Sequence, residues 1–264
     1  MAYNSIPGVP EFFVFNEGKR KTKYCLMIPI INENERIIRE LKRAKKAGIP
    51  QICDIIILDG GSTDGSIERM MDLNLGVNSI LIKTGKGHQG AQYRMGFHYA
   101  ISKGYEGFVT IDGNDKDSIE DTNRFIDKLD EGYDFVQGSR FIKGGTEKHT
   151  PLIRNLAVRL IHAPIISLAA KKRYTDTTNA FRAYSKRYIV NDKVNIFRDV
   201  FDRYELLAYL SIRVTQIGLT ATEIPVSRIY PKNEKTPTKI SPIKGNLNLL
   251  IVLLKAVFGK YNPK

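Results

Sequence analysis

The stretch DIIILDGGSTDGS, residues 54–66, decides the fold of this chain. Residues 54–58 contain the uninterrupted apolar run IIIL, which is typical of a strand buried on both faces. The glycine-rich turn GGSTDGS follows, and a short helix is expected to continue through Met70 and Met71. A buried strand that leads through a turn into a helix is half of a βαβ unit, so this stretch predicts an α/β protein.

The same alternation extends to both sides of this stretch. After the first strand, helical spacing places Ile37, Ile38, Leu41 and Ala44 on one face, and Gly48 is expected to end that helix. Such alternation predicts a Rossmann-like, mostly parallel central sheet with helices on both faces. Strands are expected at 23–30, 54–58, 79–83, 108–111 and 133–137, with helices near 32–48, 88–102 and 118–130.

The second half is less regular, and no internal repeat or linker divides the chain. We expect a single domain, with an N-terminal extension at 1–22, the α/β domain at 23–244, and a C-terminal apolar helix and tail at 245–264. Within 150–244 the sequence predicts a long basic and apolar helix at 150–172 with a bend at Pro164, strands at 177–184 and 222–229, a helix at 204–217 and a loop at 231–244. The apolar helix is expected at 247–258.

The charge of the chain is unevenly distributed. The formal net charge is +13, and residues 151–264 carry 20 basic against 7 acidic side chains. This excess indicates an anionic partner such as nucleic acid, phospholipid or a phosphorylated substrate. No apolar run approaches the ~20 residues that span a bilayer, and the first residues lack the features of a signal peptide. Cys25 and Cys53 lie in apolar runs, which indicates buried thiols in a reducing cytoplasm.

Polar side chains follow the predicted strands, where the carboxyl ends of parallel strands meet and ligands bind in open α/β sheets. For LDGGSTDGS, one interpretation is a turn in which Asp64 or Ser66 caps the helix, and the other is that Asp59 accepts hydrogen bonds from a nucleobase or ribose. The polar residues at this edge are Asn32, Glu33, Asp59, Asp112 and Arg140.

The loop IDGNDKD after the fourth strand offers oxygen ligands for a hard cation. Asp112 and Asn114 are suited to Mg²⁺ or Mn²⁺ bound together with diphosphate oxygens. The alternative is a polar loop in which Asp117 lies at the start of a helix.

The turn TGKGHQG contains Gly85, Gly87 and Gly90 in the spacing G-x-G-x-x-G between a strand and a helix. This is the dinucleotide fingerprint, and Asp112 follows at about the distance of a ribose-binding acid. Alternatively, the glycines let the backbone pass close to a nucleotide-sugar, with Lys86 near its phosphates.

Basic residues recur in the second half, and several of them opposite an acidic loop favour a site for an anionic donor and acceptor. They are Arg140, Arg154, Arg182, Arg228 and Lys239. The four histidines show no metal-ligand spacing, and signatures of a Ser/His/Asp triad are absent from the sequence.

Seven motifs in order resemble those of inverting family 2 glycosyltransferases, in particular the branch of polyprenol- or dolichol-phosphate mannosyltransferases. They are MIPIINENERI, DIIILDGGSTDGS, GKGHQGAQYRMG, GFVTIDGN, YDFVQGSRF, DTTNAFRAYS and ATEIPVSRIY, and they extend over about residues 23–242. The resemblance implies a GT-A fold, a nucleoside-diphosphate-sugar donor, Mg²⁺ or Mn²⁺, and an acceptor that is commonly a lipid phosphate.

The resemblance also implies site residues. Asp112, Arg140 and Arg154 would be catalytic, with the two arginines holding the acceptor phosphate, and Asp112 and Asn114 would bind the metal. The donor would be bound by Pro29, Asn32, Glu33, Asp59, Gly61, Ser62, Lys86, Gly87, Asp112, Arg228 and Lys239.

This chain departs from the family pattern in four places. Ile31 replaces an aromatic residue and Gly60 replaces an Asp, which leaves the base open. Asn114 replaces a metal carboxylate and Lys116 a common glutamine ligand, which implies a weaker metal site to which Lys116 supplies part of the charge.

Several functions remain open at this point. Transfer to a lipid phosphate needs no general base, because a phosphate monoester is already ionised at neutral pH. Transfer to a saccharide hydroxyl needs one, and Asp176 is the candidate. A nicotinamide-dependent oxidoreductase would use the glycine turn. A nucleic-acid-binding module is disfavoured, because carboxylates at the strand ends would repel phosphates.

For the lipid acceptor we expect a cytoplasmic protein, peripheral on the inner face of the membrane. The helix 247–258 would lie in the interface, and its alternative role is a core or dimer helix, so a homo-oligomer stays open.

Overall fold

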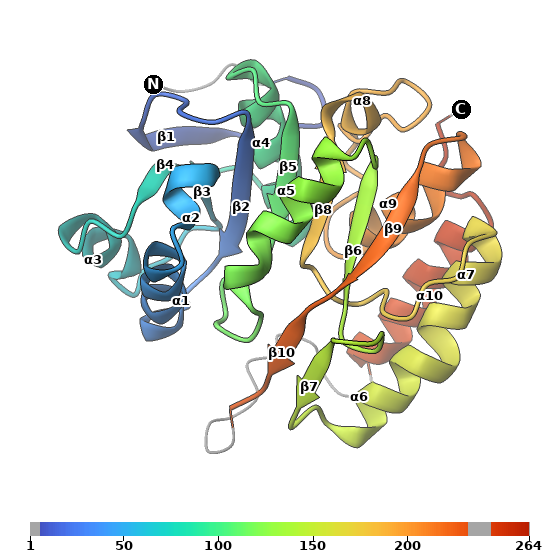
Figure 1. Ribbon diagram of the computed structural model, residues 1–264. Helices are drawn as coiled ribbons and strands as arrows, with labels where there is room; N and C mark the ends of the chain where they lie inside the picture. Colours follow the sequence, from blue (N-terminus) through green and yellow to red (C-terminus); the bar gives the residue numbers. More distant parts are fainter. Residues whose placement is uncertain (1–5, 232–243, 264) are drawn as a thin grey trace.

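The computed structural model describes residues 6–231 and 244–263, with side chains for 6–231 and 248–263. Within these residues, an eight-stranded sheet has the order β1-β4-β3-β2-β5-β8-β6-β9, and a two-stranded sheet pairs β10 with β7 (Figure 1). The strands are β1 Phe12–Glu17, β2 Tyr24–Ile30, β3 Asp54–Asp59, β4 Val77–Lys83, β5 Gly107–Thr110, β6 Phe135–Ser139, β7 Thr146–Lys148, β8 Arg182–Ser185, β9 Ala221–Pro225 and β10 Ser227–Ile229.

The central strands are parallel, as the continuous apolar runs predict. β4, β3, β2 and β5 lie side by side in parallel, and every residue of β2 and β3 is buried. In the register, Ile30 at the end of β2 is paired with Asp59 at the end of β3. The loops after these strands therefore leave the sheet at the same edge, which is where the site is built.

Helices cover both faces of this sheet, each with its own apolar core. One core includes residues of α1 and α5, and the other includes residues of α4, α7, α9 and α10. The predicted apolar face of α1 is confirmed, since Ile37, Ile38, Leu41 and Ala44 are all buried. The helices of the first half are α1 Glu35–Lys46, α2 Ile49–Ile52, α3 Ser66–Asp72, α4 Gln89–Ser102, the 3₁₀ turn η1 Ile119–Asp121 and α5 Thr122–Asp130.

The segment treated as an N-terminal extension contributes an edge strand. β1 pairs antiparallel with β4, and Phe12 is buried in the core. The rest of β1 alternates between half-buried and exposed residues, so it lacks the continuous apolar run by which its neighbours were recognised. The α/β domain therefore includes residues well before the predicted boundary at residue 23.

Two strands of the second half depart from the expected elements. The sequence predicted a strand at 177–184, but the extended residues are 182–185, which form β8. This strand runs antiparallel between β5 and β6. The predicted strand 222–229 is divided at Val226 into β9 and β10, which belong to different sheets. α8 Lys186–Ile189, α9 Glu205–Gln216 and α10 Lys244–Val257 complete this half.

The predicted long helix is continuous but not uniform. α6 Leu152–Ala157 leads into a π-helical turn, η2 Val158–His162, and then into α7 Ala163–Ala170. The irregularity therefore comes just before Pro164, where the sequence predicted a bend. α7 contacts α9 and α10, and α10 also packs on α9 (Figure 1).

Candidate active site

The loops after β2 and β3 are tied together by hydrogen bonds at the carboxyl edge of the sheet. The Asn32 side-chain oxygen accepts from the Thr63 backbone N–H (2.8 Å), and the Asn32 N–H donates to Ser62 Oγ (2.9 Å). Asn32 has the left-handed φ of 53°, which Asn adopts more readily than most residues. The two loops therefore form one rigid platform.

Asp59 organises this platform from beneath. Its carboxylate accepts hydrogen bonds from the Gly61 N–H (2.9 Å), the Ser62 N–H (3.0 Å) and Ser62 Oγ (2.5 Å), and only 1% of the residue is exposed. Gly61 has a φ of 95°, which suits a residue without a side chain. The geometry thus displays the turn of the first interpretation of LDGGSTDGS, in which Asp59 holds the Gly61–Ser62 backbone. Contact of Asp59 with a nucleobase or ribose stays a prediction.

Asp64 joins the same network at the start of α3. It accepts from the Ser66 N–H (3.1 Å) and from the Asn34 N–H (2.8 Å). Burial opposes ionisation of Asp64, but the hydrogen bonds from Ser66 and Asn34 outweigh it and lower its pKa. Gly65 occupies the N-cap position, so neither Asp64 nor Ser66 is the cap that the sequence predicted.

Other predicted donor residues surround this platform at different depths. Pro29 is buried within β2. Glu33 is close to Arg36, with 3.5 Å between the carboxylate and the guanidinium. Ile31, the departure from the family pattern, is 37% exposed at the tip of β2, so it offers an apolar surface next to Asn32.

Gln92 is a residue that the sequence analysis missed. Its buried side-chain amide donates to the Ile30 carbonyl (2.8 Å) and the Leu58 carbonyl (2.7 Å), so α4 joins the ends of β2 and β3. Gln89, one turn earlier, donates to Asp112 Oδ1 (3.0 Å). The motif HQGAQ contains both glutamines, and their spacing of three on a predicted helix was the available signal.

The glycines of the G-x-G-x-x-G turn each have a packing reason. A Cβ at Gly85 would lie 2.6 Å from the Glu11 nitrogen, and one at Gly90 would lie 2.5 Å from the Phe201 carbonyl oxygen. Gly87 has a φ of 106°. These glycines let the turn pack against the chain around β1 and residue 201. The G-x-G-x-x-G spacing is therefore explained by packing, without a bound dinucleotide. Lys86 is exposed at the tip of the turn.

Asp112 lies beyond β5 between an amide and a guanidinium. Besides Gln89, it is bound by Arg228 Nη2 at 3.3 Å. Burial raises the pKa of Asp112, but the charges of Arg228 and Lys116 outweigh it and leave the pKa below its ordinary value. Asp112 is therefore an anionic group at neutral pH, as a cation ligand has to be.

The residues of this loop fit a divalent cation in part. Among the described residues, Asn114 Oδ1 is buried and has no hydrogen-bond partner, which is unusual for an amide oxygen and fits a metal ligand. Within the described residues, no three His, Cys, Asp or Glu side chains gather to hold a metal. Asp112 and Asn114 would thus supply only two ligands to a divalent cation, and diphosphate oxygens would have to supply others.

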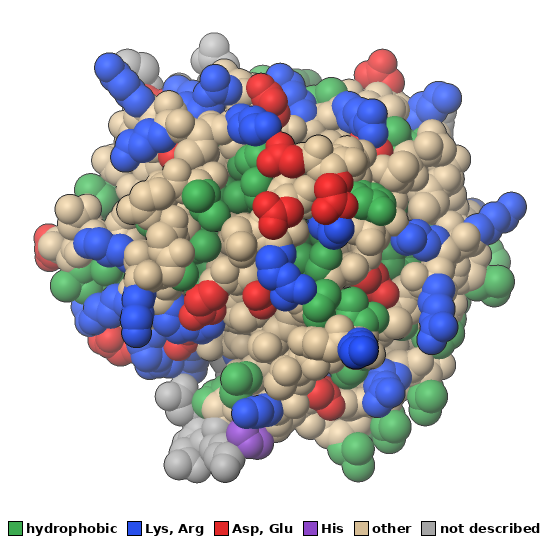
Figure 2. Space-filling model, in the orientation of Figure 1, with side chains coloured by type: hydrophobic (Ala, Val, Ile, Leu, Met, Phe, Trp, Pro, Cys, Tyr) green, Lys and Arg blue, Asp and Glu red, His purple; other side chains and the backbone are tan. Residues whose placement is uncertain are grey.

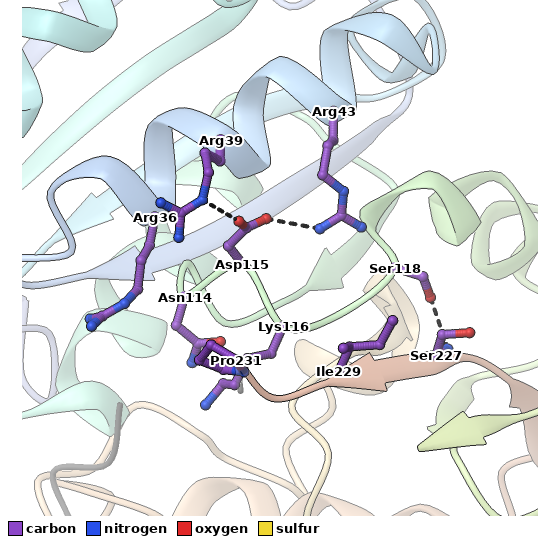
Figure 3. A pocket seen from close by; sticks show the side chains of 10 residues that line it. All are labelled: Arg36, Arg39, Arg43, Asn114, Asp115, Lys116, Ser118, Ser227, Ile229 and Pro231. Carbon is purple, nitrogen blue, oxygen red and sulfur yellow. Dashed lines mark hydrogen bonds and ion pairs between the residues drawn. The ribbon is translucent and has the colours of Figure 1, made fainter. Parts of the chain in front are cut away.

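Three arginines of α1 surround the same loop from outside. Asp115, at a left-handed φ of 57°, binds Arg39 (2.8 Å) and Arg43 (2.9 Å), and its N–H donates to the buried Glu40 (2.9 Å) (Figure 3). Arg36 points away from this pair. α1 therefore holds the residue next to Asn114 in place.

Cations and a phenol complete the loop's surroundings. Arg228 binds both Asp117 and Asp112, and burial together with Arg228 lowers the pKa of Lys116 to about 8. Burial raises the pKa of Tyr230, but Arg228 and Lys116 reverse this and bring it to about 8. Tyr230, which sequence analysis did not single out although it ends the motif EIPVSRIY, is thus a central residue of the site.

Arg140 and Arg154 have different surroundings. Arg140 binds Asp176 with two hydrogen bonds (2.6 and 3.0 Å), and its side chain is 2% exposed, so it is turned to its partner and not to an open site. Arg154 donates to the Tyr230 hydroxyl (3.2 Å), which brings α6 to the Asp112 loop. Lys239 lies outside the described residues.

A pocket of about 460 Å³ opens next to the Asp112 loop (Figure 3). Asn114 and Lys116 line it, whereas Asp59, Asp112 and Arg140 do not. The contacts of Arg228 with Asp112 and of Arg154 with Tyr230 bring Asp112, Asn114, Arg228 and Arg154 together. Asp59 lies beneath the neighbouring platform. The pocket is lined by Arg36, Arg39, Arg43, Asn114, Asp115, Lys116, Ser118, Ser227, Ile229 and Pro231.

Known proteins resemble this chain over most of its length. The sequence model of Glycosyl transferase family 2 matches residues 25–202. Polyprenol monophosphomannose synthase of Mycolicibacterium smegmatis is 27% identical over 219 residues, covering 82% of this chain and 80% of that protein. An undecaprenyl-phosphate 4-deoxy-4-formamido-L-arabinose transferase of Salmonella choleraesuis is 26% identical over 210 residues, covering 77% of this chain and 59% of that protein.

Among solved structures, glucosyl-3-phosphoglycerate synthase of Mycobacterium tuberculosis is similar with a TM-score of 0.57. It was solved with Mn²⁺, uridine diphosphate and glucosyl-3-phosphoglycerate, is 13% identical, and the match covers 92% of this chain and 80% of that one. This likeness concerns the fold. The sheet and the polar strand ends define a glycosyltransferase of the GT-A fold. More closely, the chain belongs to glycosyl transferase family 2.

Proposed function

We propose that this glycosyltransferase transfers a sugar from a nucleoside diphosphate to a polyprenyl phosphate with inversion, at the inner face of the cytoplasmic membrane. The observation that carries the lipid acceptor is an apolar and basic surface that begins at α6, the helix that holds Arg154. The named relatives act on polyprenol or undecaprenyl phosphate, which supports the same acceptor.

The apolar surface is formed by two neighbouring helical segments, and we call it the apolar face. In the segment 152–170, Leu152, Ile153, Leu160 and Leu168 are 73%, 79%, 69% and 82% exposed. Figure 2 shows apolar side chains with Lys and Arg between them over α6, at the lower right. The face consists of Leu152, Ile153, Leu156, Leu160, Ile161 and Leu168, together with Leu250, Ile251, Leu254 and Phe258 at α10.

The expectation that no stretch approaches the length of a membrane span is wrong for Leu152–Ala170, which is long and apolar enough by length and composition. Its packing nevertheless indicates another position. The inner side of α7 packs on α9 and α10. Arg154, at its start, is bonded to Tyr230 of the site. A helix held along the protein in this way would lie in the plane of the interface, with its outer side in the lipid. The sequence analysis gave this role to 247–258. That segment contributes exposed residues to the apolar face, while Leu253 and Ala256 on its other side are buried in the core.

The charge around the apolar face favours a lipid surface over a second copy of the chain. The segments 150–173 and 244–264 contain no Asp or Glu, and Arg159, Lys171, Lys255 and Lys260 are exposed there. Each such cation contributes roughly 1 kcal/mol of attraction to an anionic leaflet. Two copies meeting through this face would bring like charges together.

The geometry also favours a phosphate over a hydroxyl as nucleophile. Asp176 was the candidate base for a hydroxyl, but it is fully buried and bound to Arg140. Burial opposes its ionisation, yet Arg140 outweighs burial and lowers the pKa of Asp176, so it is a poor proton acceptor. A phosphate needs no such base.

The proposed roles follow from these positions. The platform of Asn32, Gly61 and Ser62 would receive the nucleoside, with Asp59 as its support. Asp112 and Asn114 would hold Mg²⁺ or Mn²⁺, which when bound would stabilise the negative charge on the departing diphosphate. Arg228 stabilises the same charge from β10, Arg154 holds the acceptor phosphate, and Arg140 positions its loop.

The test is a transfer assay with labelled nucleotide-sugars and undecaprenyl or dolichyl phosphate. We expect label in the organic phase for at least one common donor, and no label with the unphosphorylated polyprenol. Transfer to a soluble saccharide without any lipid product would instead establish the hydroxyl acceptor and overturn this proposal.

A further inference from the structure

Lys116 is a buried lysine in the loop that contains Asp112 and Asn114. It follows Asn114 by two residues, and only 5% of it is exposed. Its side chain lines the same pocket as Asn114, close to Pro231 (Figure 3). A buried ammonium group is unfavourable unless nearby charges or a ligand compensate for its lost hydration, so its surroundings are informative.

Within the described residues, those surroundings contain the guanidinium of Arg228 and the two carboxylates of Asp112 and Asp117. The Lys116 ammonium lies 5.0 Å from the centre of the Tyr230 ring, and the Arg228 guanidinium lies 5.7 Å from it. Arg228 is bound to Asp112 and Asp117. Counted over the described residues alone, the formal charges of Lys116, Arg228, Asp112 and Asp117 cancel, and Arg154 at the Tyr230 hydroxyl adds one positive charge.

This balance of charge argues against an absolute requirement for a divalent cation. A divalent ion at Asp112 and Asn114 would be repelled by Lys116 and Arg228, and Asp112 is the one carboxylate of its proposed ligand pair. A diphosphate, in contrast, would be attracted by the excess positive charge. An ammonium group on a flexible stem is a common phosphate ligand.

We infer that Lys116 binds the diphosphate of the donor and allows the donor to bind without a divalent cation. The inference rests on the proposed function, since it assumes a nucleoside diphosphate at this site. The metal then strengthens donor binding and is not required for it.

The experiment measures binding of UDP and GDP by titration calorimetry, with EDTA and with Mn²⁺. For the wild type we expect a nucleotide that binds in EDTA with a Kd within about 10-fold of that in Mn²⁺. Loss of one charged hydrogen bond corresponds to roughly 10-fold to 150-fold in affinity, so Lys116→Gln should lose that much in EDTA and much less in Mn²⁺.

Two variants control for indirect effects. Lys116→Arg keeps the charge and should retain binding in EDTA. Lys42→Gln removes an exposed lysine of α1 and should change neither Kd. Nucleotide binding that needs Mn²⁺ in the wild type would overturn the inference and leave the proposed function intact. Binding of neither nucleotide under either condition would overturn both.

Discussion

Arg140 shows how strongly the role of one residue depends on its partner. The motif GSR made it a candidate phosphate ligand, because a guanidinium after a strand commonly binds an anion. In the structure that anion is Asp176, at 2.6 Å, and Thr178 also accepts from Arg140. The partner lies 36 residues away in sequence and cannot be recognised from local pattern. The pair joins β6 to the chain before β8.

We expect Asp176→Asn to destabilise the protein by about 3 kcal/mol or more, because it leaves the Arg140 charge buried without compensation. Urea denaturation at neutral pH measures this. The matched control is Asp130→Asn, which breaks the ion pair with Lys23, where the side chains are 53% and 47% exposed. Exposed pairs contribute at most about 1 kcal/mol. Equal losses of stability in Asp176→Asn and Asp130→Asn would contradict the assignment of Asp176 as the buried partner of Arg140.

At the scale of elements, α1 supports the Asp112 loop through a buried carboxyl group. Glu40 is completely buried, and it accepts a hydrogen bond from the Asp115 N–H. Burial raises the pKa of Glu40 well above its ordinary value, and nearby Asp117 and Asp115 add to this against Arg43. The folded protein therefore prefers the neutral acid, whereas the unfolded chain ionises.

This carboxyl group predicts a pH dependence. Since its pKa is raised in the folded state, its contribution is complete below the unfolded pKa and declines as the pH rises. Glu40→Gln, which resembles the neutral acid, should gain stability relative to the wild type between acidic and neutral pH. Glu40→Ala should lose about 1 to 3 kcal/mol, because the Asp115 N–H loses its partner. Parallel stability curves for wild type and Glu40→Gln from pH 4 to 8 would contradict this account.

The elements differ in how well the sequence predicts them. β2 and β3 are buried on both faces, so an uninterrupted apolar run identifies each of them. β1 and β7 lie at edges and are only partly buried, and β7 (TEK) has no apolar residue, so their extended form depends on the strands beside them. Asp112 and Asn114 were predicted as parts of the site because they follow the end of a strand. Arg228 lay inside the predicted strand 222–229 and was included through its motif and the family resemblance. Gln92 and Tyr230 were missed because only the assembled sheet places them there.

At the scale of the whole molecule, the active-site edge and the apolar face adjoin each other at α6. Arg154 contacts the site, while its neighbours Leu152 and Ile153 are exposed. A lipid phosphate in the membrane plane would therefore meet the arginine without leaving the interface. The +13 charge, concentrated in this half of the chain, acts in the same direction.

We expect the triple substitution of Ile153, Leu160 and Leu168 by Ser to lower binding to phosphatidylglycerol vesicles by at least about 10-fold, since each buried aliphatic side chain contributes on the order of 1.5 kcal/mol or more. Vesicle flotation measures this. The control replaces Met71 and Leu73, which are 42% and 43% exposed near α3, by Ser. Transfer to a short, water-soluble prenyl phosphate should be unchanged by either set. Equal vesicle binding by all three proteins would contradict the position of the face.

The π-helical turn at Val158–His162 sets the angle between the two halves of this helix. Each residue of an α-helix turns the chain by about 100°. An extra residue in the wider π-helical turn therefore rotates the side chains of α6 about the helix axis relative to those of α7. Removing one residue there to restore regular winding would swing the guanidinium of Arg154 away from Tyr230, while α7 stayed seated on α9. Under the proposed function, sugar transfer and binding to the membrane would then be uncoupled by a change in winding alone, with no functional side chain altered.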